Sequence, residues 1–456
     1  MNLTEKSLLV EMSSFNEKSR ILPTSSCDVR EKPGTIDEYE RPVAKEGDAS
    51  VLQAAWNICN CVFGVGIITI PYAVREGGLI ASVLIFVTAC IIDNYTSKVL
   101  ALCLYDDVLE PDGTYRTVRV RSSYADIAEA CWKSFGRKMI ITIQLIYVTA
   151  VATLYLELSG FILVETFPQA GISQLQWTVL STLFVTPTIF LRTLTRISWS
   201  SMLAVVSVSS MFAGVLAYSI HEMENSDWKF TLDHKITIES FTICCGVLLF
   251  NFEASFAIAG VEESMRERSK FNKMVNWSYV FCTFFLLLYS IPPYLAFGDN
   301  TREFITYNLP SNAIHTIISL LLVAKALFTY PLFFFFIIDN IDLLKFRFLP
   351  PCYGRTQKEF PSPWAMIFRV VIILFCLFLA IVVPHFSKFM GFIGSLVSPW
   401  MSFICPCAFY VILKRHDIGR CELIINMVII VIATLICVVF SILSFRELVR
   451  SFKTEN

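Results

Sequence analysis

The sequence has little charge and few histidines. Charged side chains make up 16% of its 456 residues, against about 25% in soluble domains. Only five histidines are present, and no residues have the spacing of a metal site or of a phosphate-binding loop. These absences argue against an enzyme, a metal site and a cofactor. The formal net charge of -1 gives no indication of nucleic-acid binding.

A cleavable signal peptide and a disulfide framework are also missing. Residues 1–50 lack a basic start followed by an apolar run, so we expect the first membrane-spanning segment to direct insertion. The fifteen cysteines fall mostly inside apolar runs, where they behave as small hydrophobic residues. Residues 1–50 are polar and mixed in charge, and we expect them to form a disordered cytosolic tail.

What the chain has in abundance is apolar sequence. Hydrophobic residues make up 55% of the total, and the mean hydropathy is +0.61. Apolar segments of bilayer length recur at roughly 51–75, 78–104, 138–166, 175–191, 197–220, 239–261, 275–297, 312–339, 364–383, 387–412 and 422–445. We therefore predict an all-α polytopic membrane protein with eleven transmembrane helices. Residues 51–446 would form the transmembrane domain and 447–456 a short lumenal or exofacial tail.

Loop charges predict the orientation. If the N-terminal tail is cytosolic, the loops on its side hold nineteen lysine and arginine residues. The opposite loops hold five, which are Arg75, Lys229, Lys235, Arg302 and Lys388. Because cytosolic loops carry an excess of basic residues, this bias places the N-terminus in the cytosol and the C-terminus on the lumenal side.

The first apolar segment, from Trp56 to Gly78, is poorly suited to a continuous helix. Gly64 and Gly66 lie near its middle and Pro71 follows. A proline lacks a backbone donor and clashes with the carbonyl four residues earlier, here at Ile67. We expect two half-helices joined near Gly64–Gly66, a feature that marks transporter binding sites. A kinked structural helix is the alternative.

The sixth segment contains a second candidate interruption. Asn251, Glu253 and Ser255 lie at membrane depth in it, and Gly260 follows. Interruptions in helices 1 and 6 would mark two five-helix repeats in inverted topology, with helix 11 as an addition. Direct sequence identity between the two halves is not visible.

Residues near these interruptions are the candidate substrate site. An amino acid carboxylate would bind the backbone N–H groups of a half-helix, and glycine allows its close approach. The residues that supply this backbone are Gly64, Val65, Gly66 and Ile67. Asn60 lies about one turn earlier, where it would line the cavity or bond to neighbouring helices. Asn251 and Glu253 would face the substrate from across the cavity.

Three ionisable residues within apolar runs are candidates for proton coupling: Glu253, Glu157 and Lys325. A buried carboxyl is costly unless it is paired or protonated. Glu253 would therefore titrate with a proton gradient or meet a substrate ammonium group, and the alternative is a protonated structural carboxyl. Either acid would be a counter-ion for Lys325. Asp93 lies toward the cytosolic half of the second segment, where we expect an interfacial role rather than a site.

With these motifs in place, the chain resembles the amino acid/auxin permease family of the amino acid–polyamine–organocation superfamily, and within it the vesicular inhibitory amino acid (GABA) transporters. The resemblance covers roughly residues 50–450. It rests on these stretches: Trp56-Asn57 with Gly64, Pro71-Tyr72-Ala73 and Gly77-Gly78; Val118 to Arg121 with Ser123-Tyr124; Ile305-Thr306 and Asn308-Leu309-Pro310; Leu322 to Leu327 with Tyr330-Pro331; and Pro384-His385-Phe386 with Met390-Gly391 and Gly394-Ser395.

The resemblance implies a leucine-transporter-like fold and proton-coupled amino acid movement. For the vesicular members it implies loading of GABA or glycine into synaptic vesicles in exchange for protons supplied by a proton pump. A plasma-membrane or lysosomal proton–amino acid symporter is the alternative. An amino acid receptor or a channel is a second alternative. The sequence predicts no oligomeric state.

The chain departs from the vesicular pattern in its sixth segment. A Phe-Ser-Tyr-Thr run in that family corresponds here to Phe250-Asn251-Phe252-Glu253, and the family's proline corresponds to Ala259. An added carboxyl in this region would change substrate charge preference or proton coupling.

Overall fold

The computed structural model describes residues 47–109, 114–190, 194–225, 236–310, 313–344, 363–382 and 386–454. Most of the expected N-terminal tail, residues 1–46, lies outside this part of the chain. The chain divides into two compact units. One comprises Met1–Val43 and Asp107–Thr117, and the other comprises Ala44–Asp106 and Val118–Asn456. All the helices discussed below belong to the second unit.

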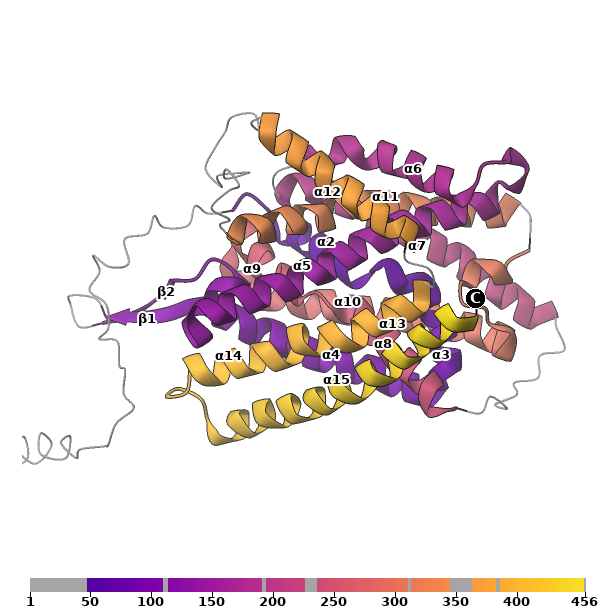
Figure 1. The fold of residues 1–456 in the computed structure, drawn as a ribbon. Coiled ribbons are helices and arrows are strands. Elements are labelled where there is room, and N and C mark those ends of the chain that lie inside the picture. The colour runs from indigo at the N-terminus through magenta and orange to yellow at the C-terminus, as the bar shows by residue number, and fades with distance from the viewer. Residues whose placement is uncertain are drawn as a thin grey trace, which may run out of the picture. The chain divides into compact units, whose positions relative to one another are not determined.

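The described elements follow one another in a mostly helical order (Figure 1). They are α2 (Val51–Val62), η2 (Val65–Thr69), α3 (Ile70–Gly77), α4 (Leu79–Leu102), β1 (Tyr105–Leu109), β2 (Tyr115–Arg119), α5 (Tyr124–Thr166), η3 (Pro168–Ala170), α6 (Gln174–Val185), η4 (Thr186–Phe190), α7 (Leu194–Asn225), α8 (Ile238–Phe252), α9 (Ser255–Ser264), η5 (Arg268–Lys270), α10 (Phe271–Phe297), η6 (Gly298–Asn300), η7 (Ile305–Asn308), α11 (Ala313–Leu343), α12 (Pro363–Val382), α13 (Phe386–Ser398), η8 (Pro399–Ile404), α14 (Cys405–Leu413) and α15 (Arg420–Thr454).

Helix starts follow from local capping residues. Ser50 precedes α2, and its side chain accepts a hydrogen bond from the Gln53 amide at 3.3 Å while Gln53 Oε1 accepts one from the Ser50 amide at 2.8 Å. The same reciprocal pair begins α6, between Ser173 and Gln176. Such capping boxes satisfy backbone donors that the first turn of a helix leaves without partners.

The number of membrane-spanning helices is the first point of comparison with the sequence. Among the described residues, nine helices are long and apolar enough to cross a bilayer, and the bent pair of α2 with η2–α3 would be a tenth. The eleven expected spans are therefore not all found. The segment expected at 175–191 forms α6, with 12 residues, and then η4, with five. The chain is a predominantly helical polytopic membrane protein.

Helix α5, Tyr124–Thr166, begins well before the expected segment at 138–166. Ser123 caps its first turn, and non-helical backbone at Trp132 and Lys133 bends it. Lys133 has a φ of 53°, in the left-handed region that side chains other than glycine rarely adopt. The residues from Tyr124 to Cys131 therefore form the part of α5 that precedes this bend.

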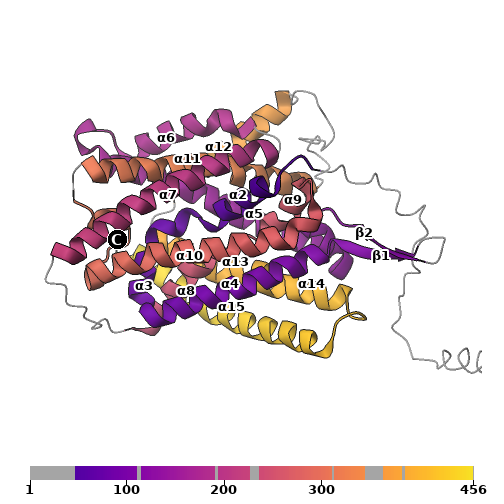
Figure 2. The same cartoon turned by 180° about the vertical axis from the view of Figure 1, so that it is seen from behind.

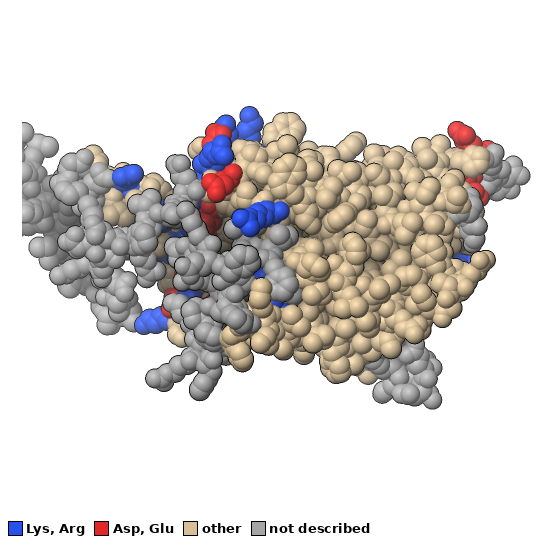
Figure 3. Space-filling view, turned by 90° about the horizontal axis from the view of Figure 1, so that it is seen from above, with Lys and Arg blue, Asp and Glu red and all other residues tan. Residues whose placement is uncertain are grey.

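The helices of the second unit pack along one another. Helix α11 packs against both α5 and α7, and α13 packs against α8 and α15, an arrangement visible from both sides in Figures 1 and 2. Large apolar side chains on α12 and α15 remain exposed. On the face shown in Figure 3, acidic and basic residues gather toward the ends and leave a broad uncharged band between them. A bilayer would cover such a band.

Candidate functional site

The first spanning segment changes direction at Phe63 and Gly64. Helix α2 ends at Val62, Phe63 has φ −76° and ψ 53°, and η2 begins at Val65. The two parts make an angle of 48°. Pro71 lies in the first turn of α3, where its missing N–H costs nothing. The turns before it wind as a tighter 3₁₀ helix, which includes Ile67.

Asn251 lies against this change of direction. A Cβ atom added to Gly66 would lie 2.7 Å from Asn251 Nδ2, and one added to Gly64 would lie 3.6 Å from Asn251 Oδ1. Asn251 Nδ2 donates a hydrogen bond to the Val247 carbonyl at 2.8 Å. Its Oδ1 is buried and has no partner. No side chain caps the start of η2 at Val65. The glycine backbone and a free amide oxygen therefore share one buried position.

Glu253 lies between α8 and α9 and occupies the start of α9. Its Oε1 accepts hydrogen bonds from the Ser255 amide, at 3.0 Å, and from the Ser255 hydroxyl. Its Oε2 accepts one from the Ser402 hydroxyl at 2.9 Å. The carboxylate thus neutralises the positive end of α9 and satisfies a backbone donor there. Both carboxylate oxygens have partners from the protein.

Ser402 comes from an unusual helical turn. It lies in η8, a π-helical stretch of six residues between α13 and α14. Pro399 begins this stretch and Pro406 follows it. Prolines remove backbone donors, and single π-helical turns inside α-helices occur often at functional sites. This widened turn brings the Ser402 hydroxyl to Glu253.

Lys325 and Asn60 form a second polar group. Lys325 Nζ donates hydrogen bonds to Asn60 Oδ1 at 2.7 Å and to Thr329 Oγ1 at 2.6 Å. Asn60 Nδ2 donates one to Ser201 Oγ at 3.2 Å. The ammonium also lies 5.5 Å from the centre of the Tyr155 ring, within range of a cation–π contact. Asn60 therefore connects the first spanning segment to α7 and α11.

The expected ion pair of Lys325 with an acid is not found. Within the described residues, no salt bridge joins Lys325 to Glu157 or Glu253. Glu157 Oε2 is buried without a partner, and the charge that acts on Glu157 is Glu303. Neutral oxygens and an aromatic ring bind the ammonium instead, so the structure separates Glu157 from Lys325.

Asp93 departs from its expected interfacial position. Its side chain is buried, and it interacts with Ser402 and Glu253. Sequence reasoning missed the hydroxyl partners Ser201, Thr329 and Ser402, because hydroxyls are common in membrane helices and give no pattern of their own. The proximity of Asp93 to Glu253 depends on how α4 packs against α8 and η8.

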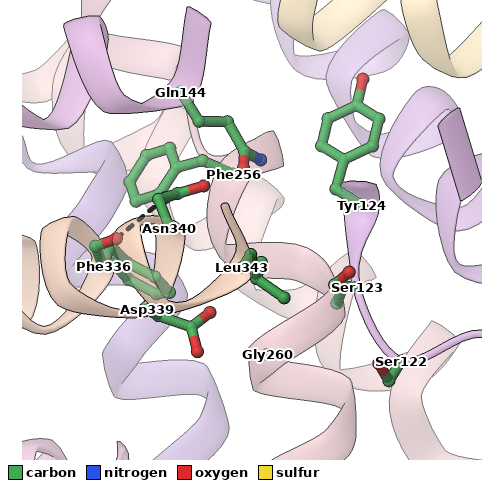
Figure 4. A pocket seen from close by; sticks show the side chains of 11 residues that line it. Ser122, Ser123, Tyr124, Gln144, Phe256, Gly260, Phe336, Asp339, Asn340 and Leu343 are labelled. Carbon is green, nitrogen blue, oxygen red and sulfur yellow. Dashed lines mark hydrogen bonds between the residues drawn. The ribbon is translucent and has the colours of Figure 1, made fainter. Parts of the chain in front are cut away.

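A pocket lies between α5, α9 and α11 (Figure 4). Gln144, Phe256 and Asn340 line it, with Ser122 and Ser123 on the side that precedes α5. Gln144 Nε2 and Asn340 Oδ1 are buried and have no partner. The pocket therefore offers one amide donor and one amide acceptor to a small polar molecule.

A charged cluster closes one end of α9. Glu262 accepts a hydrogen bond from Arg119 Nε at 2.9 Å and another from the Tyr105 hydroxyl. Burial and the neighbouring Glu262 carboxylate raise the pKa of Tyr105 above its ordinary value. The Ala49 amide donates to the Ser264 carbonyl at 2.9 Å. These contacts fix the end of α9 to the residues around it.

These features define a helical membrane protein with buried polar groups between its spanning helices. The chain belongs to the transmembrane amino acid transporter protein family, whose model matches residues 47–446. The resemblance found from the sequence is confirmed. Because this is a family of transporters, the expectation that the chain is not an enzyme is confirmed as well.

Relatives match over most of the chain. The vesicular inhibitory amino acid transporter of Xenopus tropicalis is 31% identical over 413 residues, which are 88% of this chain and 77% of that protein. The human protein of the same name is 30% identical over 95% of this chain and 82% of its own length. The vesicular GABA transporter of Caenorhabditis elegans is 27% identical over 96% of this chain and 89% of its own length.

Solved structures agree at the level of the fold. MhsT, in a complex with L-phenylalanine, matches with a TM-score of 0.53 and 13% identity, over 88% of this chain and 100% of its own. A manganese transporter from Eremococcus coleocola matches with a TM-score of 0.50 and 11% identity, over 91% of this chain and 99% of its own. These neighbours have the leucine-transporter-like fold that the resemblance implies.

Proposed function

We propose that this protein is a secondary active transporter that moves small neutral amino acids, GABA or glycine, into acidified vesicles in exchange for protons. The names of its relatives support the substrate class and the vesicular membrane. The observation that carries the proposal is the meeting of Gly66 and Asn251 in a buried position. Buried Glu253 follows Asn251 by two residues, and buried Lys325 binds Asn60 of the first spanning segment. Substrate and protons would bind to parts of the same two spanning segments.

The substrate carboxylate binds the backbone N–H groups around Gly64, Val65 and Gly66. The N–H of Ile67, the fourth residue of the expected site, donates to the Gly64 carbonyl at 3.4 Å and would have to release it to join them. The start of η2 has no side-chain cap, and the absence of a Cβ atom at Gly66 permits close approach. The free Oδ1 of Asn251 accepts a hydrogen bond from the substrate ammonium group. Glu253 already fills the start of α9, so the carboxylate is directed to η2 and not to α9.

Glu253 and Lys325 are the coupling groups in this proposal. Each is buried and bound through hydroxyls of a different helix, Ser402 for Glu253 and Thr329 for Lys325. A change of protonation at either group alters bonds that join a broken segment to its neighbours. Glu157 is the third coupling group in this proposal. The charged group that acts on it is Glu303.

The proposed membrane arrangement has eleven spans, with helices 1 and 6 interrupted in a five-plus-five inverted repeat. The bend between α2 and η2 and the non-helical Glu253 and Ala254 support the two interruptions. The N-terminus is cytosolic and the C-terminus lumenal, as the loop charges indicate. A separate proton pump supplies the gradient.

Uptake into reconstituted liposomes tests this function. The purified protein is placed in liposomes with an acidic interior and an inside-positive potential, and labelled GABA, glycine and alanine are offered outside. For one proton exchanged, 100 mV supplies about 2.3 kcal/mol. Because about 1.4 kcal/mol is a factor of ten, this corresponds to an accumulation ratio of about 50-fold. A protonophore should abolish the accumulation, and protein-free liposomes are the control.

The alternatives give different results in the same assay. A proton symporter would accumulate substrate only when the outside is acidic. A channel would equilibrate substrate without accumulation, and a receptor would bind it without movement. Any of these three outcomes contradicts proton exchange.

A further inference from the structure

Two buried carboxyl groups and one hydroxyl meet where α4, η8 and the α8–α9 junction come together. Asp93 of α4 is 2% exposed, Glu253 is 1% exposed and Ser402 of η8 is 3% exposed. Asp93 interacts with both the Ser402 hydroxyl and the Glu253 carboxyl. The three groups lie far apart in the sequence, and they meet because α4 packs against α8, α9 and η8.

The hydrogen bonds of this group need one more proton than its hydroxyl supplies. Ser402 has a single O–H, which it donates to Glu253 Oε2 at 2.9 Å. Asp93 Oδ2 is buried and has no hydrogen-bond partner. Leaving a charged oxygen unsatisfied in a buried site is expensive. A proton on Asp93 could be donated to Ser402 Oγ, which would complete the chain from Asp93 through Ser402 to Glu253.

Among the described residues, no cation is paired with either of the two acids. Asp93 or Glu253 acts on tyrosines and thiols of the surrounding helices: Tyr124 and Tyr147 of α5, Tyr279 of α10, Cys61 of α2, Cys90 of α4 and Cys405 of α14. Of these groups, Cys61 also interacts with Lys325. Within the part of the chain that the structure describes, no lysine, arginine or histidine forms a salt bridge with either acid. Two like charges this close favour one shared proton.

We propose that Asp93 and Glu253, bridged by the Ser402 hydroxyl, form a proton-binding pair that carries the exchanged proton. This inference rests on the proposed proton coupling, and it identifies Asp93 as the carboxyl that shares the proton with Glu253. In the transfer, the Asp93 O–H bond breaks as Ser402 Oγ gains that proton. The Ser402 O–H bond breaks as Glu253 Oε2 gains the other. One proton moves from Asp93 to Glu253, and the reverse transfer restores the first state.

This pair is connected to the substrate position through the chain. Glu253 Oε1 holds the Ser255 amide at the start of α9, and Asn251 lies two residues before Glu253, against Gly66. Protonation of Glu253 removes the charge that caps α9 and weakens that bond. Proton binding therefore acts on the junction that positions Asn251.

Two kinds of transport separate coupling from substrate binding. Gradient-driven uptake needs net proton movement, whereas exchange of labelled for unlabelled substrate across the membrane does not. The variants are Asp93→Asn and Ser402→Ala. The controls are Asp107→Asn, on the hairpin and bonded to Thr117, and Ser395→Ala, whose buried hydroxyl bonds only to the Phe392 carbonyl in its own helix.

We expect Asp93→Asn and Ser402→Ala to lower gradient-driven accumulation by about tenfold or more, a loss of about 1.4 kcal/mol of coupling. Exchange should stay within about twofold of the wild type, as should both activities of the controls. Asp93→Glu should restore accumulation. If Asp93→Asn accumulated substrate as well as the wild type and with the same pH profile, the proposed proton-binding pair would be wrong. Failure of the wild type itself to accumulate substrate would instead overturn the proposed function.

Infrared difference spectroscopy tests the pair without transport. Protonated carboxyl groups have a C=O stretching band that disappears on ionisation. We expect a titrating band in the wild type that is lost in Asp93→Asn and in Glu253→Gln alike, because the proton is shared, while any band of Glu157 stays in both variants. Persistence of the shared band in Asp93→Asn contradicts sharing, even if that variant transports poorly.

Discussion

Adding one methyl group at Gly66 should weaken substrate binding, because this position has no room for a side chain. A Cβ atom there would lie 2.6 Å from Met390 Sδ and 2.7 Å from Asn251 Nδ2. Met390 is flexible and can move aside. The Asn251 amide is held by its bond to the Val247 carbonyl, so Gly66→Ala forces this amide away from the backbone donors of η2.

The magnitude follows from the cost of overpacking. Inserting a methyl group into a filled site costs about 1–3 kcal/mol, which corresponds to a loss of affinity of about 5- to 150-fold. The assay is the concentration dependence of substrate exchange in liposomes, with a thermal unfolding scan to confirm folding. Gly64→Ala should have a smaller effect, because its Cβ atom would meet no atom closer than 3.5 Å.

A matched control is available in the helix that supplies Met390. A Cβ atom at Gly391 has no neighbour within 4 Å, so Gly391→Ala adds the same methyl group without a clash. The double variant Gly66→Ala with Met390→Ala removes one of the two obstructions and should recover part of the affinity. Equal affinities for Gly66→Ala and Gly391→Ala would refute the reasoning.

Three further substitutions test the neighbouring contacts. Asn251→Ala removes the free amide oxygen. It should raise the KM for exchange by about tenfold, because a hydrogen bond to a charged group is lost. An unchanged KM would exclude contact between Asn251 and the substrate. Lys325→Met replaces a buried ammonium by an apolar chain, so Tm should rise by a few degrees while uptake falls about tenfold or more, and a lower Tm would contradict this. Glu262→Gln removes the nearer of the two carboxylates that face Arg119 and leaves only Glu263, at 3.9 Å. It should lower Tm by a few degrees, with exposed Asp107→Asn as the control.

The helical class and the first bend could be predicted from the sequence because both have local causes. Apolar segments of bilayer length and the excess of basic residues on one side follow from composition alone. The bend at Phe63 and Gly64 lies beside the two glycines of this stretch, and Pro71 falls in the first turn of α3, where a new helix begins. The number of spans was harder to predict from the sequence. Helix α6 is only 12 residues long, and the 3₁₀ helix η4 follows it.

The polar contacts were harder to predict because they join distant parts of the chain. Lys325 was correctly recognised as deeply buried, but the expectation of an acidic partner was wrong. Neutral oxygens can satisfy an ammonium group as hydrogen-bond acceptors, and no sequence pattern distinguishes Asn60 from other asparagines. Asp93 was misplaced for a related reason. The face of α4 that brings Asp93 to η8 depends on tertiary packing, which has no local sequence signal.

The two broken segments are not equivalent, and this difference determines how a zwitterion would bind. At the start of α9, the Glu253 carboxylate already accepts from the Ser255 amide, so a second anion there would meet like charge. At the start of η2, no side chain caps the backbone, and Asn251 presents a neutral acceptor. In the proposed function, a substrate carboxylate would therefore bind at η2, with its ammonium group toward Asn251. Reversing the polarity would place two carboxylates at α9, and only protonation of Glu253 would relieve their repulsion.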